Sequence, residues 1–364
     1  MEKQIQKAGN KSQQIQAGTV ILGIDEKRVR EIIDEKIYIV IKELSEEASV
    51  IALERIKKFE DNLISKIVNL EDGLKSFEDP NFQLNLIEAQ KSAAGTECLA
   101  DYDLLSELLI HRIKKGKNRE KRTAIKKAIE IVGDISDEAL MGLTLVHSVG
   151  RLKPTTGNIS EGLDLLNEIY GKLMCDTLPI GSNWIDNLEI LDTIRINQQN
   201  KFTDITTFIG NSVLTGYTDV GIKINSDAYR QASETLRANN LPIFGNLVVH
   251  FLNPNYLRLD LPNIDSINST SAVIITEDGV SVFNKLTEQQ RHTIKSVYNL
   301  YEENDEIKIQ IMNSFKREWK LRPNLNKLEN WWNKLPYYFD ITSVGKVLAY
   351  ANVQRYLPGL PPLD

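Results

Sequence analysis

Cysteine is scarce in this chain, which has only Cys98 and Cys175 among its 364 residues. Two cysteines so far apart in the sequence cannot supply the disulfide framework that supports small secreted domains. We therefore expect both thiols to be reduced and buried in a cytosolic protein.

Long apolar runs are also absent. The longest ones, such as residues 37–41, contain only a few residues, whereas a transmembrane helix needs roughly 20. The N-terminus is rich in Gln and Lys where a secretion signal would have an apolar segment. The sequence thus predicts a cytoplasmic protein with no signal peptide, no transmembrane helix and no membrane partner.

The chain has no large excess of one charge sign. Its formal net charge is -6, with 26% charged and 41% hydrophobic residues, which is typical of a soluble globular protein. The negative balance argues against nonspecific wrapping of nucleic acid but leaves room for a local basic site. A chain of 364 residues exceeds the usual size of one compact core, so we expect two or three domains.

Recognisable catalytic and cofactor motifs are missing. The sequence has no glycine-rich GxxxxGKS or GxxxxGKT loop, and no serine or cysteine lies in a nucleophile elbow. The histidines lack the HxxxH or HxxE spacing of a metal site; they are His111, His147, His250 and His292. The sequence therefore indicates no cofactor and no metal, and it identifies no catalytic residue. Because many active sites have no motif, an enzymatic activity stays open.

The most informative stretch comprises residues 12–77. A β-like segment at residues 13–24 leads into residues 25–72, which contain no Gly or Pro and open with Asp25, a favourable helix N-cap. Apolar residues recur there at steps of three and four, close to an eleven-residue repeat. This pattern predicts one nearly straight helix of roughly 70 Å. The alternative is an amphipathic helix that breaks near Ser45 or Asn62 and folds back on itself.

Residues 12–77 also predict self-association. A lone strand needs a partner for its backbone groups, and the apolar stripe is longer than a compact body readily covers. We therefore expect a homo-oligomer built by this segment. Its predicted interface consists of Ile15, Val20, Leu22, Val29, Ile33, Ile37, Val40 and Leu44.

The remaining chain predicts a mainly α fold in which five parts follow one another. After the β-like segment 1–24 and the long helix 25–79, residues 80–200 form an irregular helical bundle and residues 201–285 a small α+β region. Residues 286–364 form a helical C-terminal region, opened by a capping box of Thr287 and Gln290 that starts a helix reaching about Trp319. A helix over residues 183–196 and strands at 247–252, 256–259, 272–276 and 280–283 are part of this prediction.

Two clusters could bind a partner. A basic run at residues 112–127 could hold phosphates of a nucleic acid or a nucleotide, or it could be a solvated loop between helices. The aromatic residues Trp331, Trp332 and 337–339 could form a recognition surface, although packing of the C-terminal helices is the favoured interpretation. The candidate phosphate-binding residues are Lys114, Lys115, Lys117, Arg119, Lys121 and Arg122.

Two terminal segments carry a resemblance to a known family. Residues 8–18, AGNKSQQIQAG, and residues 339–352, FDITSVGKVLAYAN, resemble the GDNSxNIQAG opening and the FxLTxVGxxIAxAN ending of an uncharacterised family of bacterial proteins often encoded near phage-defence genes. The resemblance implies a defence-related role and supplies no active-site residue.

Two functions follow from these observations. The first is a cytosolic self-assembling interaction protein of a bacterial phage-defence or stress system, with a protein partner encoded nearby. The second is an enzyme that acts on nucleic acid or nucleotides through the basic run, and nucleic acid is the less favoured partner. We prefer the first function because the sequence shows assembly features and no catalytic constellation.

Overall fold

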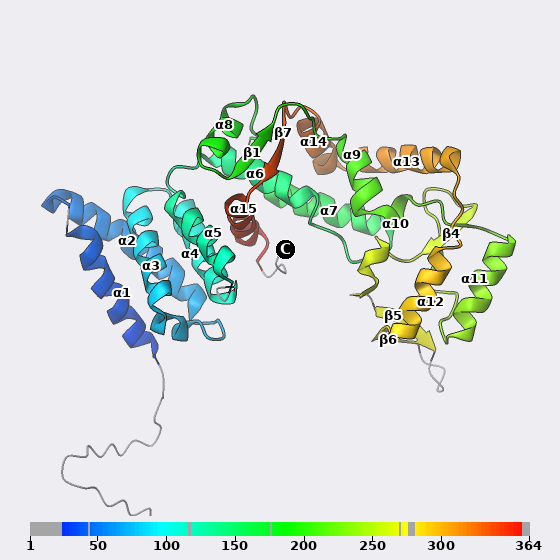
Figure 1. Cartoon of the computed structure of the whole chain (residues 1–364), viewed down its shortest axis with the longest axis horizontal. Helices are drawn as coiled ribbons and strands as arrows, with labels where there is room; N and C mark the ends of the chain where they lie inside the picture. The colour runs from blue at the N-terminus through cyan, green and yellow to red at the C-terminus, as the bar shows by residue number, and fades with distance from the viewer. Residues whose placement is uncertain are drawn as a thin grey trace, which may run out of the picture. The chain divides into compact units, whose positions relative to one another are not determined.

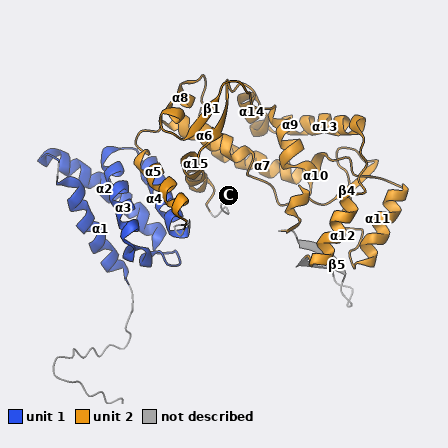
Figure 2. Ribbon diagram, viewed as in Figure 1, with its two compact units in different colours: residues 1–116 blue, residues 117–364 orange. Residues whose placement is uncertain are grey.

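The computed structural model describes residues 24–42, 44–115, 118–174, 177–268, 271–275 and 281–358. The chain forms two compact units, residues 1–116 and residues 117–364 (Figure 2). Helices dominate the described residues, and the strands form short antiparallel sheets of two or three strands (Figure 1). The predicted mainly α class is confirmed. None of the helices in the described ranges combines the length and the hydropathy that a bilayer crossing requires.

Unit 1 is a helical array centred on α2, which packs against three other helices of the unit. Buried side chains such as Phe59, Leu63, Leu86 and Leu108 form its core. Its helices are α1 (Glu26–Ile41), α2 (Glu46–Ile67), the short 3-10 helix η1 (Leu74–Glu78), α3 (Pro80–Gly95) and α4 (Leu99–Lys115).

The prediction of one long N-terminal helix was wrong, and the alternative with a break near Ser45 is confirmed. Helix α1 ends at Ile41, and the Ser45 hydroxyl accepts a hydrogen bond from the Ala48 amide at 3.3 Å to start α2. Serine competes well for backbone donors at a helix start, so it can open a new helix within an uninterrupted apolar pattern. Helices α1 and α2 contact each other as a hairpin, and both also pack on α3 (Figure 1). Most of the apolar stripe is therefore covered within unit 1 itself, whereas Leu44 and Ile51 stay exposed.

The helical part of unit 2 closes around the end of the chain. Helix α15 (Ser343–Tyr356) packs against α5, α6 and α7, and its side chains are buried on several sides. The last predicted region, 286–364, therefore completes the bundle formed by residues from 119 onward. The other helices of this part are α5 (Arg119–Glu130), α6 (Asp137–Val149), α7 (Ile159–Leu173), α8 (Asn183–Ile190) and α14 (Pro323–Trp332).

A strand pair joins distant parts of this bundle. Strand β1 (Ile194–Asn197) pairs antiparallel with β7 (Tyr338–Ile341), so that Ile196 faces Phe339. The predicted helix over residues 183–196 is wrong at its end, because α8 stops at Ile190 and the backbone of Asp192 is left-handed, with φ 56°. Pairing with a strand far along the chain outweighs the local helical pattern.

The predicted α+β region is confirmed within unit 2. Its sheet has the order β2-β4-β3, and a separate hairpin pairs β5 with β6. Leu236, Leu247 and Val297 belong to the apolar core between the sheet and its helices. The elements are β2 (Ile222–Lys223), α11 (Asp227–Ala238), β3 (Leu247–Val249), β4 (Tyr256–Leu259), η3 (Ile264–Asn268), β5 (Ser271–Ile275), β6 (Ser281–Lys285) and α12 (Glu288–Tyr298).

The capping box that opens α12 is confirmed. The Thr287 hydroxyl accepts from the Gln290 amide at 3.2 Å, and the Gln290 side chain accepts from the Thr287 amide at 3.0 Å. The predicted single helix up to Trp319 is wrong, since α12 ends at Tyr298 and α13 (Asp305–Lys320) begins after Asn304 caps the Ile307 amide at 3.1 Å. A second capping residue thus divides the helical pattern, as Ser45 does in unit 1.

Two buried arginines fasten the parts of unit 2 together. Arg258 of β4 is 2% exposed and donates to backbone carbonyls of Gly157, Gly216 and Leu261. Because carbonyl oxygens surround the guanidinium of Arg258, this charge can be buried without a carboxylate partner in direct contact.

Three short elements precede β2 in unit 2. They are α9 (Ile205–Phe208), the π-helical turn η2 (Ile209–Val213) and α10 (Thr215–Thr218).

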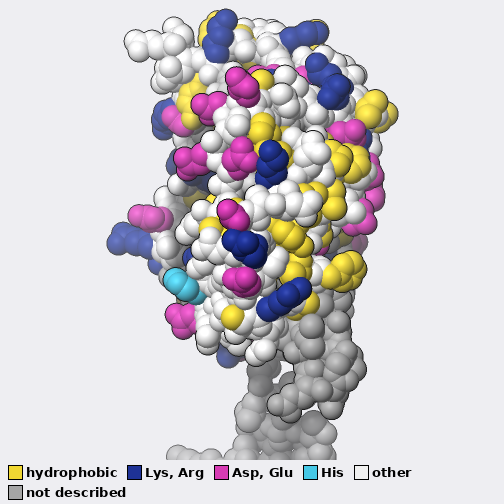
Figure 3. Space-filling view, turned by 90° about the vertical axis from the view of Figure 1, so that its right-hand side faces the viewer, with side chains coloured by type: hydrophobic (Ala, Val, Ile, Leu, Met, Phe, Trp, Pro, Cys, Tyr) yellow, Lys and Arg dark blue, Asp and Glu magenta, His cyan; other side chains and the backbone are white. Residues whose placement is uncertain are grey.

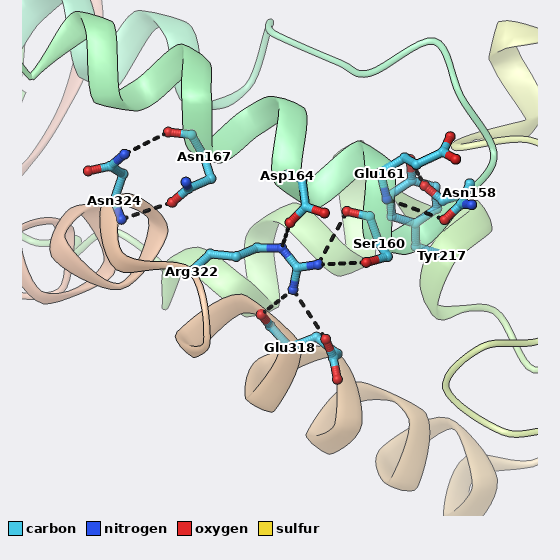
Figure 4. A network of polar contacts seen from close by, with 9 residues as sticks. All are labelled: Asn158, Ser160, Glu161, Asp164, Asn167, Tyr217, Glu318, Arg322 and Asn324. Carbon is cyan, nitrogen blue, oxygen red and sulfur yellow. Dashed lines mark hydrogen bonds and ion pairs between the residues drawn. The ribbon is translucent and has the colours of Figure 1, made fainter.

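Arg322 plays the same part between α13 and α14. Its Nε donates to Asp164 at 2.7 Å, one Nη to the Ser160 hydroxyl at 3.0 Å and the other to Glu318 at 3.1 Å (Figure 4). Asn324 adds a hydrogen bond from its amide to the Asn167 side chain at 2.9 Å. All three guanidinium nitrogens are used, so this network fixes the start of α14 on α7.

Candidate functional site

The end of the α1–α2 hairpin exposes apolar side chains. Residues 37–41 are five consecutive apolar residues, and a helix places successive side chains about 100° apart, so one face cannot bury them all. Ile37 points into the core of unit 1 and is 4% exposed, whereas Tyr38 and Ile39 are 66% and 49% exposed. An apolar run that is too long for one helix face therefore reaches the surface.

The start of α2 continues this exposed area. Leu44 in the connection is 43% exposed, and Val50 and Ile51 are 67% and 53% exposed. The Ser49 hydroxyl donates to the Ile41 carbonyl at 3.3 Å, which holds the first turn of α2 beside the last turn of α1. We call the area formed by Tyr38, Ile39, Leu44, Val50 and Ile51 the hairpin-end surface.

Charged side chains border the hairpin-end surface. Lys42, Glu46 and Glu47 are all exposed, and Glu54, one turn further along α2, pairs with Lys58 at 2.8 Å. An apolar centre with a charged rim is the usual composition of a protein interface. The local arrangement suits association with another protein surface more than it suits chemistry.

The structure distributes the predicted interface residues over three environments. Val29, Ile33 and Ile37 are 1%, 1% and 4% exposed inside unit 1, so the prediction that they lie in an intermolecular contact is corrected: they form the unit's own core. Val40 is half-buried, and Leu44 belongs to the hairpin-end surface. Outside the described residues lie Ile15, Val20 and Leu22, together with the predicted β-like segment up to residue 23.

The basic run is divided between the two units. Lys114 is exposed near the end of α4 in unit 1, whereas Arg119, Lys121 and Arg122 lie in the first turns of α5 in unit 2. Arg119 is exposed, and Lys121 and Arg122 are half-buried. The Lys115 side chain and Lys117 lie outside the described residues.

Part of the basic run has a structural role. Arg112 is 6% exposed and donates to Asp79 at 2.8 Å and to Asn81 at 3.1 Å, which ties α4 to the start of α3. Lys126 and Lys127 pair with Glu130 at 3.5 and 3.3 Å on the surface of α5. These three cations are therefore engaged within the protein, and only the middle of the run is left as a candidate for phosphate.

The histidines do not come together in a metal site. His111, His147 and His250 are buried in different elements, and His292 is exposed on α12. Burial lowers the pKa of His250 to about 4, and the ring accepts a hydrogen bond from the Leu252 amide at 3.2 Å. His250 is thus neutral and shapes the turn between β3 and β4. Among the described residues, no group of three His, Cys, Asp or Glu side chains could hold a metal ion.

An acidic hollow of about 540 Å³ lies beside the turn between α12 and α13. Asp219 on its wall accepts from Lys308 and from the Tyr298 hydroxyl, both at 2.7 Å. The Tyr256 hydroxyl donates to Glu302 at 2.9 Å, and burial together with this carboxylate raises the pKa of Tyr256 to about 12. These contacts hold the turn against the sheet, so the two carboxylates serve the fold.

Unit 2 exposes a second group of apolar side chains in its α+β region. Phe244, Val249 and Phe251 are 89%, 57% and 52% exposed. Figure 3 faces this end of unit 2 and shows hydrophobic side chains in a band between scattered charges of both signs. We call Phe244, Val249 and Phe251 the β3 surface, since they lie in or next to strand β3.

The predicted aromatic cluster lies inside unit 2. Trp331, Trp332 and Phe339 are 7%, 4% and 2% exposed. Phe202 lies between two of them, with ring centroids 4.8 Å from Trp332 and 5.2 Å from Phe339. The favoured packing interpretation therefore describes these rings.

The cysteines were expected to be reduced and buried. Cys98 is a free thiol but is only half-buried, so the expected burial is wrong for it. Cys175 lies outside the described residues.

Comparison with known proteins identifies a family but no activity. No curated protein and no solved structure matches the chain significantly. A family model, by contrast, matches residues 23–361, nearly the whole chain and both units. The description of that family assigns no reaction, ligand or partner. The chain therefore belongs to this uncharacterised family.

Proposed function

We propose that the protein is a cytosolic interaction protein that assembles with further copies of itself through the hairpin-end surface. The observation that carries this proposal is the exposure of its five large apolar side chains at one end of the α1–α2 hairpin. A group of exposed apolar side chains bordered by charged ones is characteristic of protein–protein contacts.

A second copy is the occupant that the surface fits best. In a two-fold contact the same patch serves both partners, so an apolar patch is matched by an apolar patch without any further complementary site. Each side chain keeps roughly half of its area exposed, so its burial would contribute about 1 kcal/mol. Ten side chains from two copies then contribute on the order of 10 kcal/mol, which exceeds the lower bound of about 4 kcal/mol for the cost of association by about 6 kcal/mol. The expected assembly is reversible and of micromolar to millimolar affinity.

The biological setting is part of the proposal. The resemblance of residues 8–18 and 339–352 to bacterial proteins encoded near phage-defence genes supports a role in such a defence or stress system. In that role, assembly through unit 1 would leave unit 2 available for a protein partner encoded nearby. An enzyme acting on nucleic acid or nucleotides has less support, because the exposed basic residues belong to two separate units.

The experiment compares charged substitutions on the two exposed apolar surfaces. Sedimentation of the full chain over a wide concentration range should show a reversible oligomer. Val50→Asp with Ile51→Asp should weaken it at least tenfold, because burying a charge in the contact is unfavourable. The matched control is Val249→Asp with Phe251→Asp on the β3 surface, which should leave the assembly unchanged.

Each outcome of this comparison has a defined meaning. All four positions are exposed, so circular dichroism and thermal unfolding should be unaffected in both double variants. Loss of the oligomer in the control alone would place the contact on the β3 surface and reject the hairpin-end surface. A wild-type chain that stays monomeric at tens of micromolar and above would reject self-assembly at a useful affinity.

Substitution in the core of the hairpin should have a different effect. Ile33→Asp with Ile37→Asp places two carboxylates at positions that are 1% and 4% exposed. We expect unit 1 to unfold, since isolated charges cannot be buried without a partner. If the double variant stays folded and loses only its self-association, Ile33 and Ile37 lie in the intermolecular interface and not in the core of unit 1.

A further inference from the structure

A cavity in the helical part of unit 2 has apolar walls and a basic rim. It has a volume of about 340 Å³ and lies between the segment before α8 and one face of α14. Its walls include Leu178, Trp184, Trp331 and Leu335. A volume in this range is typical of small-molecule sites. We call it the tryptophan pocket.

The two tryptophans fix the walls of the pocket. The Trp331 indole donates to the Pro179 carbonyl at 2.8 Å, and the Trp184 indole donates to the Gly181 carbonyl at 3.1 Å. The two rings lie 6.0 Å apart. Trp184 and Trp331 are only 2% and 7% exposed, and because both indole N–H groups are already bonded to the loop at 179–181, the small part of each ring that reaches the pocket is apolar. The pocket is therefore formed before any ligand enters.

The charge of the lining has one sign. Lys327 on α14 and Lys334, two residues beyond the end of α14, are exposed and line the same pocket. The pocket lining contains no acidic residue, and neither lysine has an ion pair among the described residues. Between them, the exposed Asn330 offers an amide. Two cations beside an apolar pocket favour a ligand that combines an anionic group with an apolar part, because the apolar part can be buried in the pocket.

We propose that the tryptophan pocket binds a small organic anion with an apolar body, a carboxylate or phosphate carried by an alkyl chain or ring. The apolar part lies against Trp184, Trp331 and Leu335, and the anionic group lies at the rim between Lys327 and Lys334. Ile180, which is 84% exposed at the rim, covers part of the apolar body when the site is filled. This site lies within unit 2 and is independent of the hairpin-end surface in unit 1.

Calorimetry of the full chain with probes of one chain length tests the charge requirement. Octanoate and octyl phosphate should each bind with one molecule per chain, and octylammonium should bind at least tenfold more weakly. Hexanoate should bind about tenfold more weakly than octanoate, because two fewer methylene groups are buried. Tighter binding of octyl phosphate than of octanoate would identify a phosphate ligand, and the reverse order would identify a carboxylate.

Charge reversal at the rim separates this site from nonspecific binding. Lys327→Glu with Lys334→Glu should weaken octanoate binding at least tenfold and strengthen octylammonium binding, and Ile180→Glu should weaken octanoate binding too. The matched control, Lys153→Glu with Lys201→Glu, changes the net charge equally at exposed positions outside the pocket lining and should leave octanoate binding unchanged. All these positions are exposed, so folding is preserved.

Three results would overturn the proposal. They are equal affinity for octanoate and octylammonium, equal loss of binding in the control variant, and no saturable octanoate binding up to about 10 mM, which would leave less than about 3 kcal/mol of binding free energy. Intrinsic tryptophan fluorescence gives a second readout, because a ligand in the pocket changes the surroundings of Trp184 and Trp331. Ligand binding should leave the oligomeric state unchanged, so this test is independent of the proposed self-assembly.

Discussion

Replacement of Glu60 by Gln should stabilise unit 1 at neutral and alkaline pH. Glu60 lies on α2, is 6% exposed and accepts a hydrogen bond from the Gln90 side chain at 3.0 Å. Burial raises the pKa of this carboxyl from 4.5 to about 7, and the neighbouring carboxylates Asp34 and Asp61 act in the same direction. The folded state therefore binds the proton of Glu60 more tightly than the unfolded state does.

The sign of the pH dependence follows from this difference. The favourable contribution of protonated Glu60 is fully present below about pH 4.5, declines as the pH rises toward 7 and is absent above it. Each unit of pKa shift corresponds to 1.36 kcal/mol, so the stability contributed by protonated Glu60 that is lost at pH 8 amounts to about 3 kcal/mol. Gln resembles the protonated acid in shape and can still accept from Gln90, so Glu60→Gln should equal the wild type near pH 4 and exceed its stability by about 3 kcal/mol at pH 8.

Hydrogen exchange of the full chain measures this effect where it arises. Peptides from α2 and α3, followed by mass spectrometry and corrected for intrinsic exchange rates, report the opening free energy of unit 1 at several pH values. The control is Glu47→Gln, an exposed position on the same helix, which removes a carboxylate from α2 and should not reproduce the gain in stability at pH 8. A Glu60→Gln variant with no pH-dependent gain, or with lower stability than the wild type at pH 8, would refute the assignment of a buried, destabilising carboxylate.

Three further expectations concern other parts of the chain. Arg322→Leu should lower the stability of unit 2 by about 3 kcal/mol, because the carbonyl oxygens of Ser160 and Glu318 lose a charged hydrogen-bond donor. Chemical denaturation followed by tryptophan fluorescence measures this loss, and a much smaller loss would show that the network is dispensable. Thr287→Ala should cost about 1 kcal/mol by removing one half of the capping box of α12, measurable in the same assay with Thr235→Ala, in the interior of α11, as comparison. Replacement of the basic residues Lys114, Lys115, Lys117 and Arg119 by Glu should leave the circular dichroism spectrum unchanged. It should abolish any retardation of oligonucleotides by the protein in a gel at low salt. A wild-type protein that retards no oligonucleotide would remove the main support for an enzyme that acts on nucleic acid.

Local chemistry explains what could be predicted from the sequence. The capping box of Thr287 and Gln290 involves residues three apart, so its two hydrogen bonds need no distant partner. The α+β region was predictable because alternating β-branched residues and turn residues at 247–285 favour strands over short distances. The mainly α class follows in the same way from many short segments with helical periodicity and their own caps.

The candidate surfaces were less accessible to sequence reasoning. The apolar run at 37–41 was visible, but its periodicity could not separate Ile37, which is buried, from Tyr38 and Ile39, which are exposed. The tryptophan pocket gave only the signal of a Trp-Trp pair, because its other wall comes from residues 178–184, far from Lys327 and Lys334 in the sequence.

The amino-acid sequence by itself determined where most helices begin and the general α-helical class, because these depend on side chains within a few residues of one another. Only the tertiary structure decided what each apolar face contacts. Ser45 is compatible with a helix interior and with a helix cap, and packing of α1 on α2 and α3 selects the cap. Ile196 likewise becomes part of a strand because it pairs with Phe339 from near the end of the chain. Such choices depend on contacts between distant segments, and no local pattern encodes them.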